Sequence, residues 1–271
     1  MVLIDVGNNH TKLLVIDVGN TNTVLGVFQG TQLRAQWRLT TNRAQTGDEY
    51  GILIRNLFAL DGIQADQIAG IMVASVVPPL NALLEEMAQK YFHLKALFLG
   101  PGTRTGVAIH YENPQEVGAD RIANSVAAFE KYGGPCVIVD FGTAITFDVV
   151  SEKGEYLGGV IAPGLGISSD ALFARTARLP RVEIRDPQRV IGTNTVGSIQ
   201  SGLFYGAVGT VDGILDRLYA ELGPQTKSIA TGGQAALVAG ASKYKLPLEP
   251  ALTLEGLRII YERNLPNAKR R

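Results

Sequence analysis

The sequence of 271 residues has few cysteines, few histidines and no excess of charge, and each shortage excludes a class of protein. Its one cysteine, Cys136, cannot form an intramolecular disulfide, and its apolar neighbours predict a small core residue. Lys plus Arg and Asp plus Glu number 25 each, so the chain lacks the surplus charge of nucleic-acid and membrane-surface binders. The three histidines are far apart and lack metal-ligand spacing. These absences favour a small-molecule partner.

Targeting and membrane segments are also missing from the sequence. The chain opens Met1-Val-Leu-Ile-Asp5, with no basic segment and with an acid inside the apolar stretch, which is unlike a signal peptide. The longest nearly uncharged apolar run, residues 71–80, contains two prolines and is too short to span a bilayer. We therefore expect a soluble cytoplasmic protein that binds neither membrane nor nucleic acid.

Two common nucleotide-binding loops are absent, and a different phosphate motif occurs twice. There is no Gly-Lys dipeptide and no Gly-x-Gly-x-x-Gly, which excludes a Walker A loop and the dinucleotide fingerprint. The motif Asp17-Val-Gly-Asn-Thr-Asn-Thr23 follows the apolar run 13–16, and Asp140-Phe-Gly-Thr-Ala-Ile-Thr146 follows the run 136–139. Each run predicts a buried strand, the glycine permits a tight turn, and the polar groups after it can bind phosphate. Two such turns facing each other predict a site for a nucleoside triphosphate and its metal, for which Asp17 is a suitable carboxylate.

The two halves of the chain begin alike. Strand-like segments at 23–28 and 33–39 follow the first turn, and segments at 146–150 and 155–161 follow the second. Helical segments come after each meander, so we predict a three-layer α/β fold that occurs twice, in residues 13–130 and 131–271. Residues 3–11 imitate residues 15–23, but only the second copy leads into a strand. We therefore expect Asp17 to be functional and treat residues 1–12 as an N-terminal extension.

Two further segments carry candidate chemistry, and each has a plainer alternative. Asp120 lies in Gly118-Ala-Asp-Arg121 before the apolar helix pattern 122–131. It is either a helix N-cap beside a solvated arginine or the general base of a phosphoryl transfer. Thr231-Gly-Gly233 follows a short strand and is either a simple turn or a place where the backbone of Gly232 and Gly233 approaches adenine or ribose. Phosphoryl transfer suits a chain whose available groups are acids and backbone amides.

Several motifs resemble known kinases. The two Asp-x-Gly-x-Thr turns and the late Thr-Gly-Gly resemble the acetate and sugar kinase, Hsc70 and actin superfamily. The run Tyr111-Glu-Asn-Pro-Gln-Glu-Val-Gly-Ala-Asp-Arg121 resembles the type III pantothenate kinases in particular. Further matches are Ser75-Val-Val-Pro-Pro79, Gly158-Gly-Val-Ile-Ala-Pro-Gly164, Leu179-Pro180, Asn194-Thr195 and Ser198-Ile-Gln-Ser-Gly202. The resemblance implies two ribonuclease H-like (actin-like ATPase) halves, each a mixed five-stranded sheet flanked by helices.

The same resemblance implies an activity and residue roles. It implies ATP-dependent phosphorylation of pantothenate, the first committed step towards coenzyme A, by a homodimer. Asp120 is then the proton acceptor, Asp140 binds K⁺ or NH₄⁺, and Mg²⁺ accompanies ATP near Asp17, directly or through water. The implied ATP-binding residues are Asp17, Val18, Gly19, Asn20, Thr21, Asn22, Thr23, Val24 and Thr143. The implied pantothenate-binding residues are Tyr111, Gly118, Ala119, Asp120, Arg121 and Thr195.

Two alternatives stay open beside this reading. One is a kinase of another small hydroxyl substrate, which should lack the segments around Tyr111 and Asp120. The other is a non-enzymatic regulatory accessory factor, which the loss of Asp17, Asp120 or Asp140 would have favoured. All of these features are present in the chain.

Overall fold

The computed structural model describes residues 11–266. Contacts divide the chain into two compact units. Unit 1 holds the described residues 11–106, 112–127 and 253–266, and unit 2 holds residues 107–111 and 128–252. The predicted extension lies outside the described residues except for Thr11 and Lys12. Lys12 begins the first strand, and its Nζ donates to Oε1 of Gln67 at 2.8 Å.

Unit 1 is built on a five-stranded mixed sheet with the order β3-β2-β1-β4-β5. The strands are β1 (Lys12–Val18), β2 (Asn22–Gln29), β3 (Gln32–Thr40), β4 (Ile68–Ser75) and β5 (Leu97–Phe98). The first three strands form an antiparallel meander, and β4 and β5 run parallel to β1. The central strand β1 is apolar because both of its faces are covered, whereas β3 alternates between exposed and half-buried residues.

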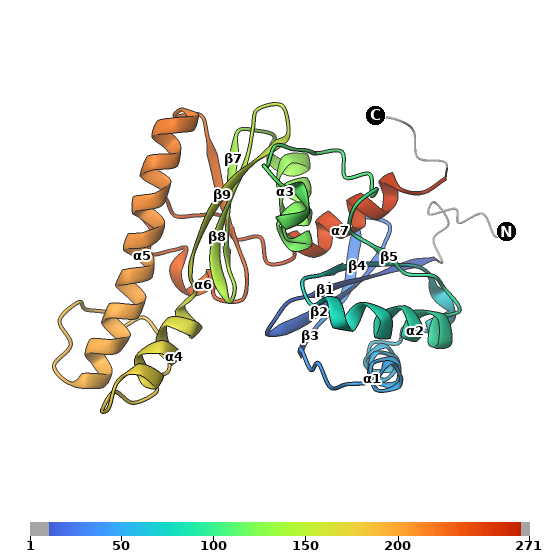
Figure 1. The fold of residues 1–271 in the computed structure, drawn as a ribbon, viewed down its shortest axis with the longest axis horizontal. Coiled ribbons are helices and arrows are strands. Elements are labelled where there is room, and N and C mark those ends of the chain that lie inside the picture. The colour runs from blue at the N-terminus through green and yellow to red at the C-terminus, as the bar shows by residue number, and fades with distance from the viewer. Residues whose placement is uncertain (1–10, 267–271) are drawn as a thin grey trace. The chain divides into compact units, whose positions relative to one another are not determined.

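Two helices, α1 (Gly47–Leu60) and α2 (Asn81–Phe92), lie side by side against this sheet (Figure 1). The start of α1 is a capping box, in which Thr46 and Glu49 satisfy each other's backbone N–H groups. Ile54, Phe58 and Met87 are buried in the core of unit 1 beneath the sheet. Short 3₁₀ turns at Ala65–Gln67, Pro78–Leu80 and Pro114–Glu116 complete the connections.

Unit 2 also has a five-stranded mixed sheet, with the order β10-β7-β8-β9-β6, in which the fifth strand, β6, lies beyond β9 and not beyond β10. The strands are β6 (Ala108–Ile109), β7 (Cys136–Phe141), β8 (Ala144–Val150), β9 (Glu155–Pro163) and β10 (Lys227–Thr231). Again three strands form an antiparallel meander, and β10 runs parallel to β7. The predicted repeat of a mixed five-stranded sheet flanked by helices, the ribonuclease H-like arrangement, is confirmed.

The helices of unit 2 are α4 (Leu165–Arg175), α5 (Thr195–Leu222) and α6 (Ala235–Val238). The long α5 runs along one face of the sheet (Figure 1), where Val211 and Leu215 pack on apolar residues of β7 and β8. Cys136 is fully buried, and this burial raises the pKa of its thiol to about 12. The prediction of a structural core cysteine is confirmed.

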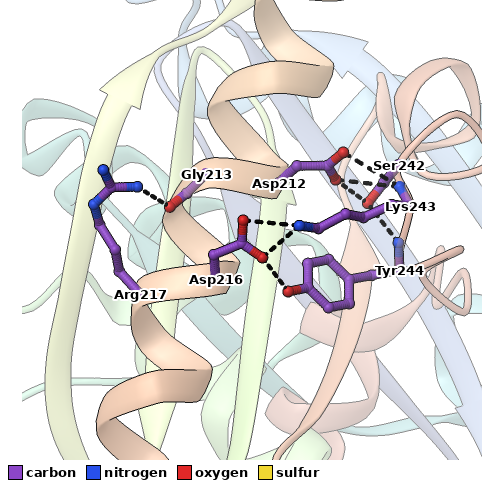
Figure 2. Close-up of polar contacts among 7 residues, drawn as sticks. All are labelled: Asp212, Gly213, Asp216, Arg217, Ser242, Lys243 and Tyr244. Atoms are coloured by element: carbon purple, nitrogen blue, oxygen red, sulfur yellow. Dashed lines mark hydrogen bonds and ion pairs between the residues drawn. The ribbon is translucent and has the colours of Figure 1, made fainter.

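Polar side chains connect α5 to the segment that follows α6. Asp212 and Asp216 on α5 face Ser242, Lys243 and Tyr244 in the segment after α6 (Figure 2). Ser242 Oγ donates to Asp212 Oδ1 at 2.6 Å, and Lys243 Nζ lies 2.6 Å from Asp216 Oδ1. The Tyr244 hydroxyl donates to Asp216, and this bond raises the pKa of Tyr244 to about 12.

The last helix, α7 (Leu252–Arg263), belongs to unit 1 by its contacts, whereas we expected residues 131–271 to form the second half. The reason is close packing at two glycines. Gly256 of α7 lies against the backbone of Ala123 in α3 (Ala119–Tyr132), and Gly70 of β4 lies against the Tyr261 ring. Neither glycine has room for a side chain, so the sequence at both positions matches the docking of α7 on unit 1.

Candidate active site

The first phosphate turn joins the carboxyl end of β1 to the start of β2 in unit 1. Asp17 pairs with Val24 on β2 and with Ala74 on β4, which fixes it at the end of the central strand. The Gly19 N–H donates to the Asn22 carbonyl at 2.9 Å and closes the turn. Asn20 and Thr21 are exposed at its tip, where a phosphate can reach them. The structure therefore places Asp17, and the turn after it, as the sequence predicted.

One residue of this turn faces inward. Thr23 is fully buried, and its hydroxyl lies 3.0 Å from the Thr41 hydroxyl. Thr41 Oγ1 in turn donates to the Gly19 carbonyl at 2.7 Å. The Thr23 side chain therefore stabilises the turn, and it is not presented to solvent as we had expected of a phosphate donor.

Asp120 lies in the first turn of α3, inside unit 1. The Gly118 carbonyl accepts the first helical bond, from the Ile122 N–H at 3.1 Å, so Gly118 and not Asp120 occupies the N-cap position. The Asp120 carboxylate instead accepts from the Arg121 N–H at 2.8 Å. A Cβ on Gly118 would lie 2.5 Å from Asp120 Oδ1, so glycine leaves space for the carboxylate. The alternative of an N-capping aspartate is wrong.

The electrostatics of Asp120 differ from those of an ordinary surface acid. Burial raises the pKa of Asp120, and the hydrogen bond from Arg121 and the charge of Arg121 oppose this only in part. Arg121 itself is only 9% exposed, so the alternative of a solvated arginine is also wrong. A half-buried carboxyl with a raised pKa at a helix start is the type of group that serves as a general base.

The second phosphate turn joins β7 to β8 in unit 2 and lies beside the Thr-Gly-Gly segment. Asp140 pairs with Thr146 on β8 and with Thr231 on β10, so the ends of β7 and β10 meet at one edge. Gly232 has a φ of +95°, and a Cβ there would collide with the Asp140 carboxylate and lie 2.6 Å from the Phe141 nitrogen. Thr143 is exposed at the tip of the turn, as is Gly233 after the Thr-Gly step. The structure thus brings Asp140, Thr143 and Gly232 together.

Tyr111 and Thr195 also belong to unit 2, at separate elements. Tyr111 follows β6, is 37% exposed, and lies over Gly158 and beside Tyr156. Thr195 is the first residue of α5, where the Asn194 side chain caps the helix by accepting from the Gly197 N–H at 2.8 Å. An open groove of about 650 Å³ passes Thr195, between apolar residues of α4 and α5.

The predictions from sequence missed Asp148 and Tyr156, of which Tyr156 lies beside Tyr111. Asp148 and Tyr156 are fully buried, and the Tyr156 hydroxyl donates to Asp148 Oδ1 at 2.9 Å. A carboxyl within the apolar strand Ala144–Val150 is the signal that could have identified them, since a buried acid needs a partner.

Within residues 11–266, no three side chains of His, Cys, Asp or Glu gather where they could hold a metal ion together. No helix in that range combines the length and the apolar character that crossing a membrane requires.

The two mixed sheets, each with a strand–turn–strand motif at Asp17 or Asp140, define the class of actin-like, ribonuclease H-like folds. A solved structure of the same fold is that of a Baf family transcriptional activator from Campylobacter jejuni. It has a TM-score of 0.58 and 22% sequence identity, and the match covers 93% of this chain and 98% of that one.

Sequence comparison narrows the class to one family. The family profile "Type III pantothenate kinase" matches residues 13–217. A type III pantothenate kinase of Koribacter versatilis is 60% identical over 96% of this chain and 98% of its own length. The corresponding protein of Solibacter usitatus is 57% identical over 94% of this chain and 98% of its own. The chain belongs to the type III pantothenate kinase family.

Proposed function

We propose that this protein transfers the γ-phosphoryl group of ATP to the hydroxyl of pantothenate, with Asp120 as the general base. The product is 4'-phosphopantothenate, and the reaction is the first step of coenzyme A biosynthesis. The family supports the reaction, since relatives with this activity in their names match nearly the full chain. The observation that supports the role of Asp120 is its half-buried carboxylate at the start of α3, beside Arg121.

The base acts by holding the proton of the attacking hydroxyl. A raised pKa makes the Asp120 carboxylate a stronger proton acceptor than a surface aspartate, provided that it is ionised at the working pH. Phosphoryl transition states are loose, so base catalysis contributes about 10²–10⁴-fold, and positioning and charge supply the remainder. Arg121 is proposed to bind the carboxylate of pantothenate and, together with Gly118 and Ala119, to orient this substrate.

The ATP-binding residues are proposed in both units. In unit 1 they form the turn from Asp17 to Val24, where the backbone and the exposed Asn20 and Thr21 receive phosphate oxygens. In unit 2 they are Thr143 and the backbone of Gly232 and Gly233. Gly232 packs on Asp140 and Phe141 of the second turn, and this neighbourhood supports a contact of its backbone with the adenosine of the same nucleotide.

Two cations are part of the proposal. Asp17 is assigned to Mg²⁺, directly or through water, and Asp140 to K⁺ or NH₄⁺. The donor chemistry fits, because both groups are carboxylates at strand ends beside a phosphate turn, and hard cations prefer oxygen ligands. These cations supply positive charge that neutralises the phosphates. Tyr111 and Thr195 are proposed to line the pantothenate site, and the enzyme is proposed to work as a cytoplasmic homodimer.

The test is pantothenate-dependent ADP release by the purified protein with Mg-ATP, first in K⁺ and then in Na⁺ buffer. We expect release that requires pantothenate and that falls strongly in Na⁺. Equal rates in the two buffers would contradict the cation at Asp140. ADP release with another hydroxyl substrate but not with pantothenate would favour a different small-molecule kinase. No release under any condition would favour a regulatory factor.

A further inference from the structure

We infer that Asp148 and Tyr156 form a positioning pair that holds Tyr111 in place for pantothenate. The inference rests on the proposed function, since it concerns the same substrate site. All three residues belong to unit 2. Asp148 and Tyr156 are fully buried, whereas Tyr111 is partly exposed to solvent.

The buried Asp148 carboxylate accepts hydrogen bonds from two hydroxyl groups. Asp148 Oδ1 accepts from the Tyr156 hydroxyl at 2.9 Å, and Oδ2 accepts from Thr146 Oγ1 at 3.2 Å. Thr146 pairs directly with Asp140 across the strands of the second phosphate turn. A buried acid loses much of its hydration, so these bonds hold the Tyr156 ring in one orientation.

A β-bulge turns Tyr156 towards Asp148. Val149 pairs with Gly158 and Val150 pairs with Tyr156, so Leu157 is an extra residue on β9. Asp148 and Val150 lie on one face of β8, and Tyr156, opposite Val150, lies on that same face. Bulges of this type re-aim side chains next to active sites. Without the bulge, the alternation along β9 would place Tyr156 on the other face.

The oriented Tyr156 and Gly158 then support Tyr111. The two tyrosine rings are 6.3 Å apart between centroids and inclined by 50°, and a Cβ on Gly158 would lie 3.4 Å from the Tyr111 ring. The backbone is held as well, because the His110 N–H donates to the Tyr156 carbonyl at 2.8 Å. The Tyr111 ring therefore packs on Tyr156 and Gly158, which hold it in one position, and its exposed part can contact a ligand.

The test compares two removals of a buried tyrosine hydroxyl in the full-length protein. Tyr156→Phe removes the hydroxyl that bonds to Asp148. Tyr50→Phe is the matched control, because the Tyr50 hydroxyl is equally buried and has no hydrogen-bond partner among residues 11–266. For Tyr156→Phe we expect KM for pantothenate to rise about three- to tenfold, the net worth of one hydrogen bond, while KM for ATP and kcat stay within about twofold. Tyr50→Phe should leave all three constants unchanged.

A second measurement shows whether Tyr156 acts through Tyr111. In a Tyr111→Ala background, Tyr156→Phe should no longer change KM for pantothenate, because the ring that it positions is gone. An undiminished effect in that background would overturn the inference, as would an unchanged KM in Tyr156→Phe alone. A lack of pantothenate-dependent turnover in the wild type would instead contradict the proposed function.

A third variant applies if Tyr156→Phe fails to fold. Asp148→Asn keeps an oxygen that accepts the Tyr156 hydroxyl, so KM for pantothenate should stay within about twofold of the wild type. A large rise in KM would show that the charge of Asp148 matters rather than its bond to Tyr156, and the positioning role would be wrong.

Discussion

Replacing Asp120 by asparagine separates the charge of the proposed base from its shape. The amide keeps the size of the side chain and an oxygen that accepts from the Arg121 N–H, so the start of α3 should be unchanged. It cannot accept the proton of the substrate hydroxyl. We expect kcat/KM for pantothenate to fall about 10²–10⁴-fold, the range for a general base, while ATP binding survives.

The same substitution should not lower stability at neutral pH. Burial raises the pKa of Asp120 in the folded state above its ordinary value of 3.8. A raised pKa means that the stability contribution is complete below the unfolded pKa and is lost as the pH rises through the folded pKa. At pH 7 the charged form therefore disfavours the folded state. Asp120→Asn removes this charge, so its Tm should be equal to or above that of the wild type.

The assay combines a pH profile of kcat/KM with thermal unfolding at pH 7. The wild type should lose activity as the pH falls through the raised pKa of Asp120, and the residual activity of Asp120→Asn should lack this dependence. Asp66→Asn, on an exposed 3₁₀ turn, is the control with the same chemical change and should match the wild type. Near-normal turnover by Asp120→Asn would refute the assignment of the base, and a clear drop in its Tm would refute the argument from burial.

Three further predictions concern single residues. Gly232→Ala should abolish most turnover, because the new Cβ would collide with the Asp140 carboxylate and the φ at this position disfavours alanine. Turnover is measured as ADP release, and a wild-type rate would show that Gly232 is not closely packed. Cys136 should resist iodoacetamide at pH 8 in the folded protein and react in denaturant, because burial raises the pKa of its thiol to about 12. Labelling of the native protein would contradict this burial. Thr46→Ala should lower the free energy of unfolding by about 1 kcal/mol through loss of the capping box, as denaturant titration can measure, with turnover unchanged.

The sequence allowed the repeated core of the fold to be predicted because local patterns specify it. Apolar runs before Asp17 and Asp140 became the interior strands β1 and β7, and the segments after each turn became the meanders. Because the motif at Asp17 recurs at Asp140, the sequence alone was enough to predict the second turn. Each of these features is encoded within a few neighbouring residues, where periodicity and turn chemistry operate.

Other features depend on contacts between distant segments, and local patterns do not contain them. The two-residue strand β6 is too short to show alternation, and it joins the second sheet only by pairing with β9. The docking of α7 on unit 1 depends on glycines at positions 70 and 256, which resemble any other glycine in sequence. The inward orientation of Thr23 and the bond between Tyr156 and Asp148 likewise appear only when partners from other strands are in place.

The return of α7 to unit 1 has a consequence for the order in which the protein folds during synthesis. Translation produces residues 11–106 of unit 1 before any of unit 2, and residues 253–266 of unit 1 after all of unit 2. Gly70 and Ala123 therefore lack their packing partners on α7 until residues 253–266 have been made. Unit 2, by contrast, has all of its segments once residue 252 has emerged. The nascent second unit can thus complete its core before the first, against the usual order in which N-terminal domains fold ahead of those that follow.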